Sequence, residues 1–307
     1  MFPYGRSGAI TVLGAILTLT LAGCGSAAKS ALSGQIIAVG AENQYANVIQ
    51  QIGGRYVSVT AIMSNPNTDP HTFEASPSIA KTVSAARLIV QNGVGYDSFM
   101  DNIEAATANS ARKVIDVQQL LRLPDSTPNP HLWYAPRTMP AVAAALAKAL
   151  TRMQPAHAAY FAANVRSFDT ALKPWLKAIA QFKADYPGTA VATSEPVADY
   201  MLRAAGTRNL TPFGLRADIM NGVDPAPQDI TFQNDLFSGR KVKVFVYNQQ
   251  VTDTLTQNFK GAAARAGIPV VGVYETMPLG YSYQRWMLAE VQALQRAVAD
   301  DKSTERL

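Results

Sequence analysis

The sequence PAHAAYFAANVRSFDTALKPWLKAIAQF, residues 155–182, is the longest periodic stretch of the chain. Its apolar side chains recur at alternating spacings of four and three residues, at Phe161, Val165, Phe168, Leu172, Trp175, Ile179 and Phe182. Such spacing places one apolar stripe along a single α-helix, which would run roughly 40 Å at 1.5 Å per residue. A helix of this length exceeds a crossover between neighbouring strands, so we expect it to join two lobes.

Strand-like apolar runs alternate with helix-like segments on both sides of this helix. The expected strands are residues 34–41, 57–63, 87–93, 113–118, 189–194, 241–248 and 269–275. The expected helices between and after them are residues 42–53, 77–86, 96–107, 138–151, 195–205, 224–237, 252–266 and 281–299. This alternation is typical of a parallel sheet with crossover helices. The sequence therefore predicts an α/β fold of two Rossmann-like lobes with parallel-rich sheets, joined by one long rigid helix, with the ligand site in the cleft between them.

The first residues have the pattern of an export signal. Arg6 precedes an apolar run, residues 8–23, that is too short for a comfortable membrane span and ends in small residues. Leu21-Ala22-Gly23-Cys24 is similar to the bacterial lipobox, in which the cysteine is lipidated and becomes the first residue of the mature protein. Cys24 is the single cysteine of the chain, which excludes a disulfide within it.

These signals predict the organisation and location of the protein. We expect a signal peptide at residues 1–23, a lipidated tether at 24–33, a first lobe at 34–152, a linking helix at 153–184 and a second lobe at 185–307. Removing the leader takes away Arg6 and lowers the formal net charge of +5 by one, and the remaining charges are scattered. This pattern does not indicate nucleic-acid binding. The mature protein is expected to be monomeric, extracytoplasmic and anchored to the cell membrane through Cys24.

Four polar residues follow predicted strands, where parallel sheets place their ligands. They are His71, His131, Glu195 and Glu275, two from each half of the chain. Two imidazoles and two carboxylates form a plausible set of ligands for a divalent first-row metal. Each residue also has a plainer interpretation: the histidines as loop residues, Glu195 as an acid in the first turn of a helix, and Glu275 as a solvated strand end.

Two further residues are near or comparable to these candidates. His157, the third histidine of the chain, falls near the start of the long helix, where a solvated helix face explains it. Glu74, three residues after His71, could accept a hydrogen bond from an imidazole or cap a helix, and it is not predicted to be a ligand.

The combination resembles the metal-binding lipoproteins of bacterial ABC importers, the cluster A-I solute-binding proteins for manganese, zinc or iron. DPHTFEASPSIA, residues 69–80, is similar to one family segment and implies His71 as the first ligand; NPHLWYAP, residues 129–136, is similar to another and implies His131 as the second. Asn129 stands where the family usually has aspartate. TSEPVADYML, residues 193–202, places Glu195 at the third ligand position, and DPAPQDI, residues 224–230, is a further family landmark.

The resemblance also bears on the metal and the partners. Glu275 occupies the position of a family aspartate, and its side chain is one methylene longer. A glutamate at the third position goes with manganese- or iron-type members, and two carboxylates make a harder site than three imidazoles. We therefore expect Mn²⁺ as the favoured cargo, with Zn²⁺ or Fe²⁺ possible, no organic cofactor, and an ABC permease with its ATPase as partners.

Two other functions are compatible with the same residues. A metal-dependent extracytoplasmic hydrolase would need an open coordination position and a general base, for which Glu74 or Asp199 could serve. A surface adhesin could use the same fold without metal transport. No G-x-S-x-G elbow or cysteine nucleophile supports covalent catalysis, and the sequence favours a binding protein over an enzyme.

Overall fold

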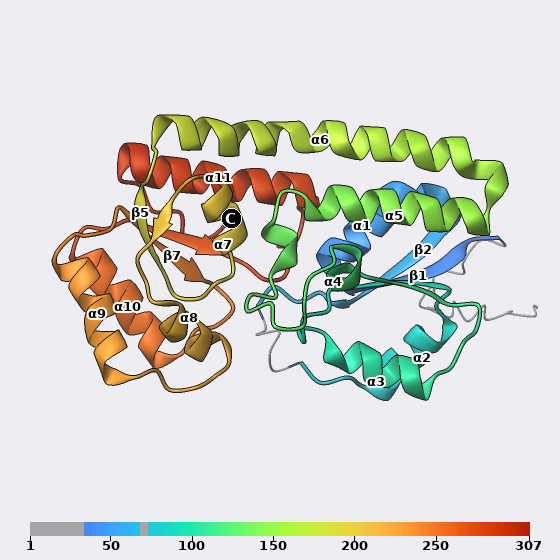
Figure 1. Cartoon of the computed structure of the whole chain (residues 1–307), viewed down its shortest axis with the longest axis horizontal. Coiled ribbons are helices and arrows are strands. Elements are labelled where there is room, and N and C mark those ends of the chain that lie inside the picture. The colour runs from blue at the N-terminus through green and yellow to red at the C-terminus, as the bar shows by residue number, and fades with distance from the viewer. Residues whose placement is uncertain (1–33, 68–72) are drawn as a thin grey trace, which may run out of the picture.

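The computed structural model describes residues 34–67 and 73–307. The predicted signal peptide, the tether with Cys24, and His71 lie outside these residues. The described chain forms two four-stranded sheets in which all pairings between strands are parallel, and helices cover both sheets (Figure 1). The predicted α/β class is confirmed.

The first sheet has the strand order β2-β1-β3-β4. Its strands are β1 (Ile36–Glu42), β2 (Val57–Met63), β3 (Leu88–Gln91) and β4 (Lys113–Asp116). The helices of this part are α1 (Asn43–Gly53), α2 (Pro77–Ala85), α3 (Ser98–Ala106), α4 (Val117–Leu120) and α5 (Thr138–Met153). Strands β1 and β3 are almost wholly buried, which explains their continuous aliphatic sequences.

The second sheet repeats this arrangement in the order β6-β5-β7-β8. Its strands are β5 (Ala190–Thr193), β6 (Arg208–Asn209), β7 (Val244–Asn248) and β8 (Val270–Val273). The accompanying helices are α7 (Asp199–Ala204), α8 (Phe213–Met220), α9 (Pro227–Ser238), α10 (Thr254–Arg265) and α11 (Tyr283–Asp300). Corresponding strands therefore occupy corresponding places in the two sheets.

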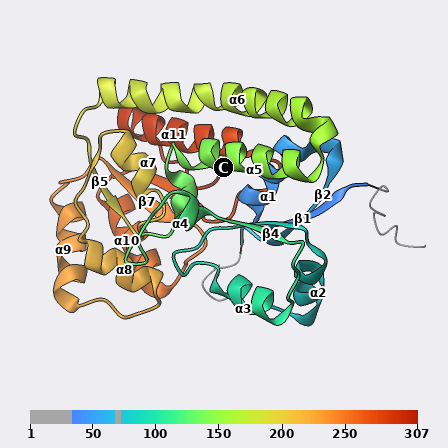
Figure 2. The same ribbon diagram turned by 45° about the vertical axis from the view of Figure 1, so that its right-hand side comes forward.

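The long helix α6 (Ala158–Asp185) runs across the top of both sheets (Figures 1 and 2). Six of its seven predicted stripe residues are buried, and Val165 is half-buried against the same core. The helix contacts α1 and α5 on one side and α7 and α11 on the other. Helix α11 lies alongside α6 and also contacts α1, so the lobes are packed against each other as well as linked by α6.

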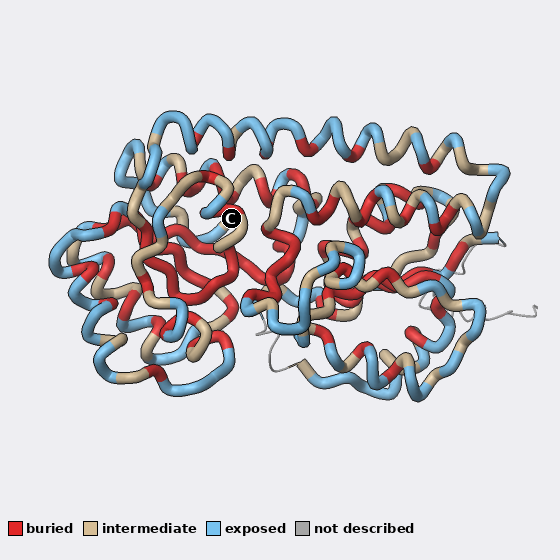
Figure 3. The backbone as a smooth tube through the Cα atoms, viewed as in Figure 1, coloured by how far each residue is buried: buried red, intermediate tan, exposed pale blue. Residues whose placement is uncertain are grey.

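One hydrophobic core extends under α6 from the first sheet to the second. It includes Ile49 from α1, Trp133, Trp175 from α6, and Trp286 from α11, all fully buried. Buried backbone continues from one lobe to the other in Figure 3. A continuous core of this kind resists wide separation of the lobes. Within the part of the chain that the structure describes, no helix is long and apolar enough to cross a membrane.

Several predicted boundaries were wrong, and the errors cluster at strand ends. The predicted strand 113–118 ends at Asp116, whose carboxylate accepts a hydrogen bond from Gln119 N and starts α4. The helix predicted from Glu195 begins at Asp199, so Glu195 lies in the connection before it. Strand β8 ends two residues before Glu275. The short β6 and α8 were not predicted.

Candidate metal centre

The carboxyl ends of both sheets supply the predicted site residues that the structure describes. His131 follows β4 and α4 along the chain, Glu195 lies two residues after β5, and Glu275 two residues after β8. Their exposed fractions are 0%, 2% and 0% respectively. Full burial of one imidazole and two carboxylates excludes the interpretation of these residues as solvated loop or strand-end groups.

His131 and Glu275 meet although they are far apart in the sequence. His131 Nε2 lies 3.1 Å from Glu275 Oε2. The other ring nitrogen, Nδ1, lies 2.8 Å from Asn129 Oδ1, while the Asn129 amide nitrogen donates to Pro196 O at 2.7 Å. Because that amide oxygen only accepts, Nδ1 carries a proton, and the lone pair of a neutral ring is on Nε2. The contact between Nε2 and the carboxylate therefore requires a proton or a cation between them.

The hydrogen bond to Pro196 gives a physical reason for asparagine at position 129. A carboxylate could orient the imidazole equally well, but it could not donate to a backbone carbonyl. Asn129 does both, and it thereby connects the loop of His131 to the residue that follows Glu195. Tyr200 OH also donates to Asn129 O, at 2.8 Å. The His131 loop is thus held against the second lobe.

The two carboxylates of the second lobe share one donor. Asn248 Nδ2, at the end of β7, lies 2.8 Å from Glu275 Oε1 and 3.1 Å from Glu195 Oε1. The hydroxyl of Tyr96, from the first lobe, donates to Glu275 Oε2 at 2.9 Å. The backbone N–H of Glu275 donates to Gln250 Oε1 at 2.7 Å. These bonds fix two carboxylates side by side without neutralising their charge, which leaves them suited to a cation.

The first lobe also contains two buried acidic side chains. Glu42, at the end of β1, and Asp97 are 1% and 2% exposed. Burial raises the pKa of Glu42 well above its ordinary value, with a further contribution from the charge of Asp97. Burial likewise raises the pKa of Asp97 to about 6, although two backbone N–H groups oppose the shift. The pKa of Tyr96 is raised by burial and by Glu275, which keeps its hydroxyl a donor.

The geometry does not assemble the whole predicted set. His71 lies outside the described residues, so its place relative to the other three is not given. Among residues 34–67 and 73–307, no three His, Cys, Asp or Glu side chains are grouped so that they could hold a metal ion. The described residues provide instead an imidazole–carboxylate contact and a carboxylate pair bridged by Asn248.

Sequence reasoning missed the residues that orient the carboxylates. Asn248 is the last residue of a strand that was itself predicted, so the rule that selected Glu275 would also have selected it. Tyr96 gave a weaker signal, since a tyrosine near a helix start is common. The remaining candidates from the sequence have other surroundings: Glu74 is exposed, Asp199 pairs with Arg216, and His157 stacks on Tyr56 with ring centroids 3.9 Å apart.

The fold and this centre together define a two-lobed solute-binding protein. The family model described as zinc-uptake complex component A, periplasmic, matches residues 39–297, and the chain belongs to this family. The family comprises extracytoplasmic metal-binding components of ABC uptake systems, which work with a permease and an ATPase, and it is not an enzyme class. The predicted family is confirmed, and the hydrolase alternative is not favoured.

Individual relatives carry different metals in their names. The manganese-binding lipoprotein MntA of Bacillus subtilis is 25% identical over 267 residues, covering 83% of this chain and 85% of the relative. The iron-binding protein YfeA of Yersinia pestis is 22% identical over 216 residues, covering 67% of each. The structure of FpvC from Pseudomonas aeruginosa in complex with Mn²⁺ superposes with a TM-score of 0.71 at 19% identity, covering 87% of this chain and 99% of that one.

Proposed function

We propose that this chain captures a divalent transition metal between its lobes and delivers it to the permease of an ABC importer, with His71, His131, Glu195 and Glu275 as the ligands. The observation that carries this proposal is the contact of 3.1 Å between His131 Nε2 and Glu275 Oε2, both fully buried and supplied by different lobes. A bound metal would replace the proton between them, so uptake is coupled to proton release.

Mn²⁺ is the favoured cargo in this proposal. Two carboxylates and two imidazoles form a harder set of ligands than three imidazoles, and harder sets suit manganese. The names of MntA and YfeA point to manganese and iron in relatives of this chain. Zn²⁺ follows Mn²⁺ in the Irving–Williams order and would still bind tightly, so selectivity for Mn²⁺ would depend on supply and geometry rather than on affinity alone.

The mature protein is proposed to begin at Cys24, to be anchored to the cell membrane by lipid on that residue, and to act as a monomer. The lobes are proposed to span residues 34–152 and 185–307, with 153–184 as the link. The lipobox-like Leu21-Ala22-Gly23-Cys24 supports the anchor, and MntA carries the word lipoprotein in its name. The continuous core under α6 supports release by small tilts and loop movements rather than by wide opening.

Competitive titration with Mn²⁺ and Zn²⁺ tests the ligand assignment. His71→Ala is expected to lower the affinity for both metals more than about 100-fold, since loss of a ligand exceeds the effect of losing a supporting hydrogen bond. His157→Ala is the matched control, because it removes a histidine that stacks on Tyr56 away from the site, and it should leave both affinities unchanged. Equal affinities in the wild type and His71→Ala would overturn the assignment.

A further inference from the structure

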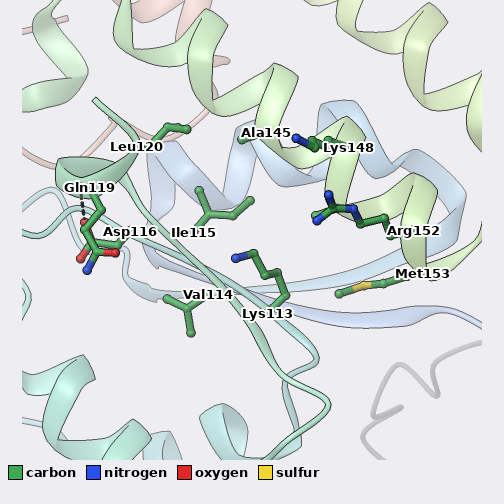
Figure 4. Close-up of a pocket in the computed structure, with 11 residues that line it drawn as sticks. Lys113, Val114, Ile115, Asp116, Gln119, Leu120, Ala145, Lys148, Arg152 and Met153 are labelled. Atoms are coloured by element: carbon green, nitrogen blue, oxygen red, sulfur yellow. Dashed lines mark hydrogen bonds between the residues drawn. The ribbon is translucent and has the colours of Figure 1, made fainter. Parts of the chain in front are cut away.

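A cavity lies between the edge strand β4 and helix α5, on the first lobe (Figure 4). Its volume is about 450 Å³. Lys113, Lys148 and Arg152 surround it, and the side chains of Ile115, Ala149 and Met153 form its apolar lining. In the described sheet β4 pairs with β3 alone and is therefore an edge strand, and the cavity beside it is bordered by both α4 and α5.

The three cations of this cavity are exposed and lack partners within the described chain. None of Lys113, Lys148 and Arg152 forms a side-chain hydrogen bond or an ion pair with another described residue. Lys148 and Arg152 are four residues apart on α5, a spacing at which like charges repel each other. The acid of the cavity, Asp116, accepts from the backbone of Gln119. The arrangement therefore favours an external anion that is bound to an apolar group.

This cationic surface adjoins the point where the described chain begins. Met153 ends α5, and the next residue, Gln154, donates its side-chain amide to Gly34 O at 2.6 Å. Gly34, Gln154 and Arg55 line another cavity, of about 470 Å³, so a fourth cation also lies near Gly34. The described chain therefore begins beside the basic cavity.

The length of the tether then limits what can face the cavity. Gly34 is ten residues after Cys24, and a fully extended chain of that length spans at most about 35 Å. If Cys24 carries lipid, as proposed above, the surface around Gly34 stays within that distance of the bilayer. Cations near a bilayer are attracted to anionic lipids within about one Debye length, which is about 8–10 Å at physiological salt.

We propose that Lys113, Lys148 and Arg152 form a docking surface for the anionic phospholipid headgroups of the membrane to which the protein is tethered. The charged headgroup would contact the three cations, and the upper part of an acyl chain would contact Ile115, Ala149 and Met153. This proposal rests on the lipid anchor and is independent of which residues bind metal. It implies that the tether and the cavity together orient the first lobe at the membrane, rather than leaving the protein free to rotate.

The test uses the lipidated mature protein in vesicles of phosphatidylcholine, with or without phosphatidylglycerol. Amine acetylation followed by mass spectrometry gives a rate for each lysine. Lys113 and Lys148 should react more slowly in the anionic vesicles, because an amine held against an anionic headgroup stays protonated and is shielded from the reagent. Lys173 and Lys177, exposed on the part of α6 beside the second lobe, are internal references and should not change. High salt should restore the rates of Lys113 and Lys148.

Two variants distinguish binding at this surface from a general effect of the positive charge of the protein. Arg152→Gln should weaken the protection of Lys113 and Lys148, whereas Lys243→Gln, which removes one exposed cation from the second lobe, should not. Equal rates at Lys113 and Lys148 in both kinds of vesicle would overturn the proposal. Protection by inorganic phosphate without lipid would also overturn it, in favour of a site for free anions.

The anchor and the metal site are measured on the same samples. Flotation with phosphatidylcholine vesicles reports the anchor, and metal titration reports the site between the lobes. If the protein does not float, the anchor is wrong, and an excess of anionic vesicles added in solution then tests the surface directly. Absence of protection in that experiment would overturn the docking surface as well.

Discussion

The two lobes place equivalent residues at equivalent points of their sheets. In the first, β1 pairs with β3 through Gly40 and Val90; in the second, β5 pairs with β7 through Thr193 and Val246. Two residues further on, Glu42 therefore corresponds to Glu195, and Asn92 to Asn248. Both asparagines are fully or almost fully buried. The lobes thus share a glutamate and an asparagine at the same edge of the sheet.

These equivalent residues make different contacts. Asn248 bonds directly to the side chains of Glu195 and Glu275. Asn92 instead accepts from Tyr45 OH at 2.6 Å and donates to Pro130 O at 2.8 Å, next to His131. Glu42 is buried beside Asp97, and its pKa is raised by that burial. The second lobe thus holds its carboxylates at the proposed metal site. In the first lobe, Asn92 supports the backbone next to His131, and Glu42 lies buried beside Asp97.

The largest loss of metal affinity is expected when one proposed ligand of either lobe is removed. His131→Ala and Glu195→Ala are each expected to lower Mn²⁺ affinity more than about 100-fold, because the set has no spare member. Zn²⁺ should be more sensitive to His131→Ala, since imidazole suits zinc and carboxylate suits manganese. Isothermal titration with both metals measures this contrast. Equal losses of both metals in both variants would show that the lobes do not differ in the metal they favour.

Lowering the pH should weaken binding through the histidine lobe. A protonated imidazole cannot bind a metal, so the affinity should fall as the pH is lowered from 7.5 to 5.5. In His131→Ala the residual pH dependence should be shallower. An affinity that is constant over this range would exclude histidine from the metal site.

Replacing each of the two asparagines by alanine tests whether the equivalent positions have different roles. Asn248→Ala should lower metal affinity by about 10- to 100-fold, since it orients the carboxylates from outside the metal. Asn92→Ala should change affinity less and lower the free energy of unfolding by about 1–3 kcal/mol, because it leaves buried groups at Tyr45 and Pro130 without their partner. Metal titration and thermal denaturation of both variants separate the two effects. Similar results for the two variants would remove the distinction.

An effect on stability rather than on metal affinity is expected at Glu290, which joins the lobes away from the site. Trp286 Nε1 donates to it at 2.8 Å and Tyr134 OH at 3.2 Å, and burial raises its pKa from 4.5 to about 8. The unfolded chain loses this proton near pH 4.5 while the folded protein keeps it, so the free energy of unfolding falls as the pH rises from 4.5 to 8.

Glu290→Gln should remove this part of the pH dependence, which amounts to no more than about 1.4 kcal/mol per pH unit. Urea denaturation at several pH values measures it, with Asp300→Asn, an exposed change on the same helix, as the control. A slope in Glu290→Gln equal to that of the wild type would show that Glu290 does not carry the proton.

The sequence predicted those elements well in which the apolar periodicity extends over many residues or nearly every side chain is buried. The stripe of α6 and the aliphatic runs of β1, β3 and β7 were recognised, because a buried helix face leaves a repeating pattern and a buried strand leaves a continuous apolar run. The ends of elements were less accessible. Glu195 resembled a helix start, although Asn248 holds it in the connection before α7. That contact depends on the pairing of strands separated by dozens of residues, which local spacing does not encode.

The same limit applies to the candidate site. His131 and Glu275 were predicted from their places after strands, and the structure brings them together. Tyr96 and Asn248 were missed because their importance follows from contacts across the lobes rather than from their neighbours in the sequence. The double role of Asn129 also required the position of Pro196 to be known.

The most direct test of the central claim is a crystal structure of the protein soaked with metal, with anomalous scattering recorded at the absorption edge of that metal. One ion is expected between the lobes, bound by the imidazoles of His71 and His131 and by the carboxylates of Glu195 and Glu275, at about 2.0–2.2 Å for zinc. An ion bound by residues of a single lobe, or placed away from His131 and Glu275, would contradict the account.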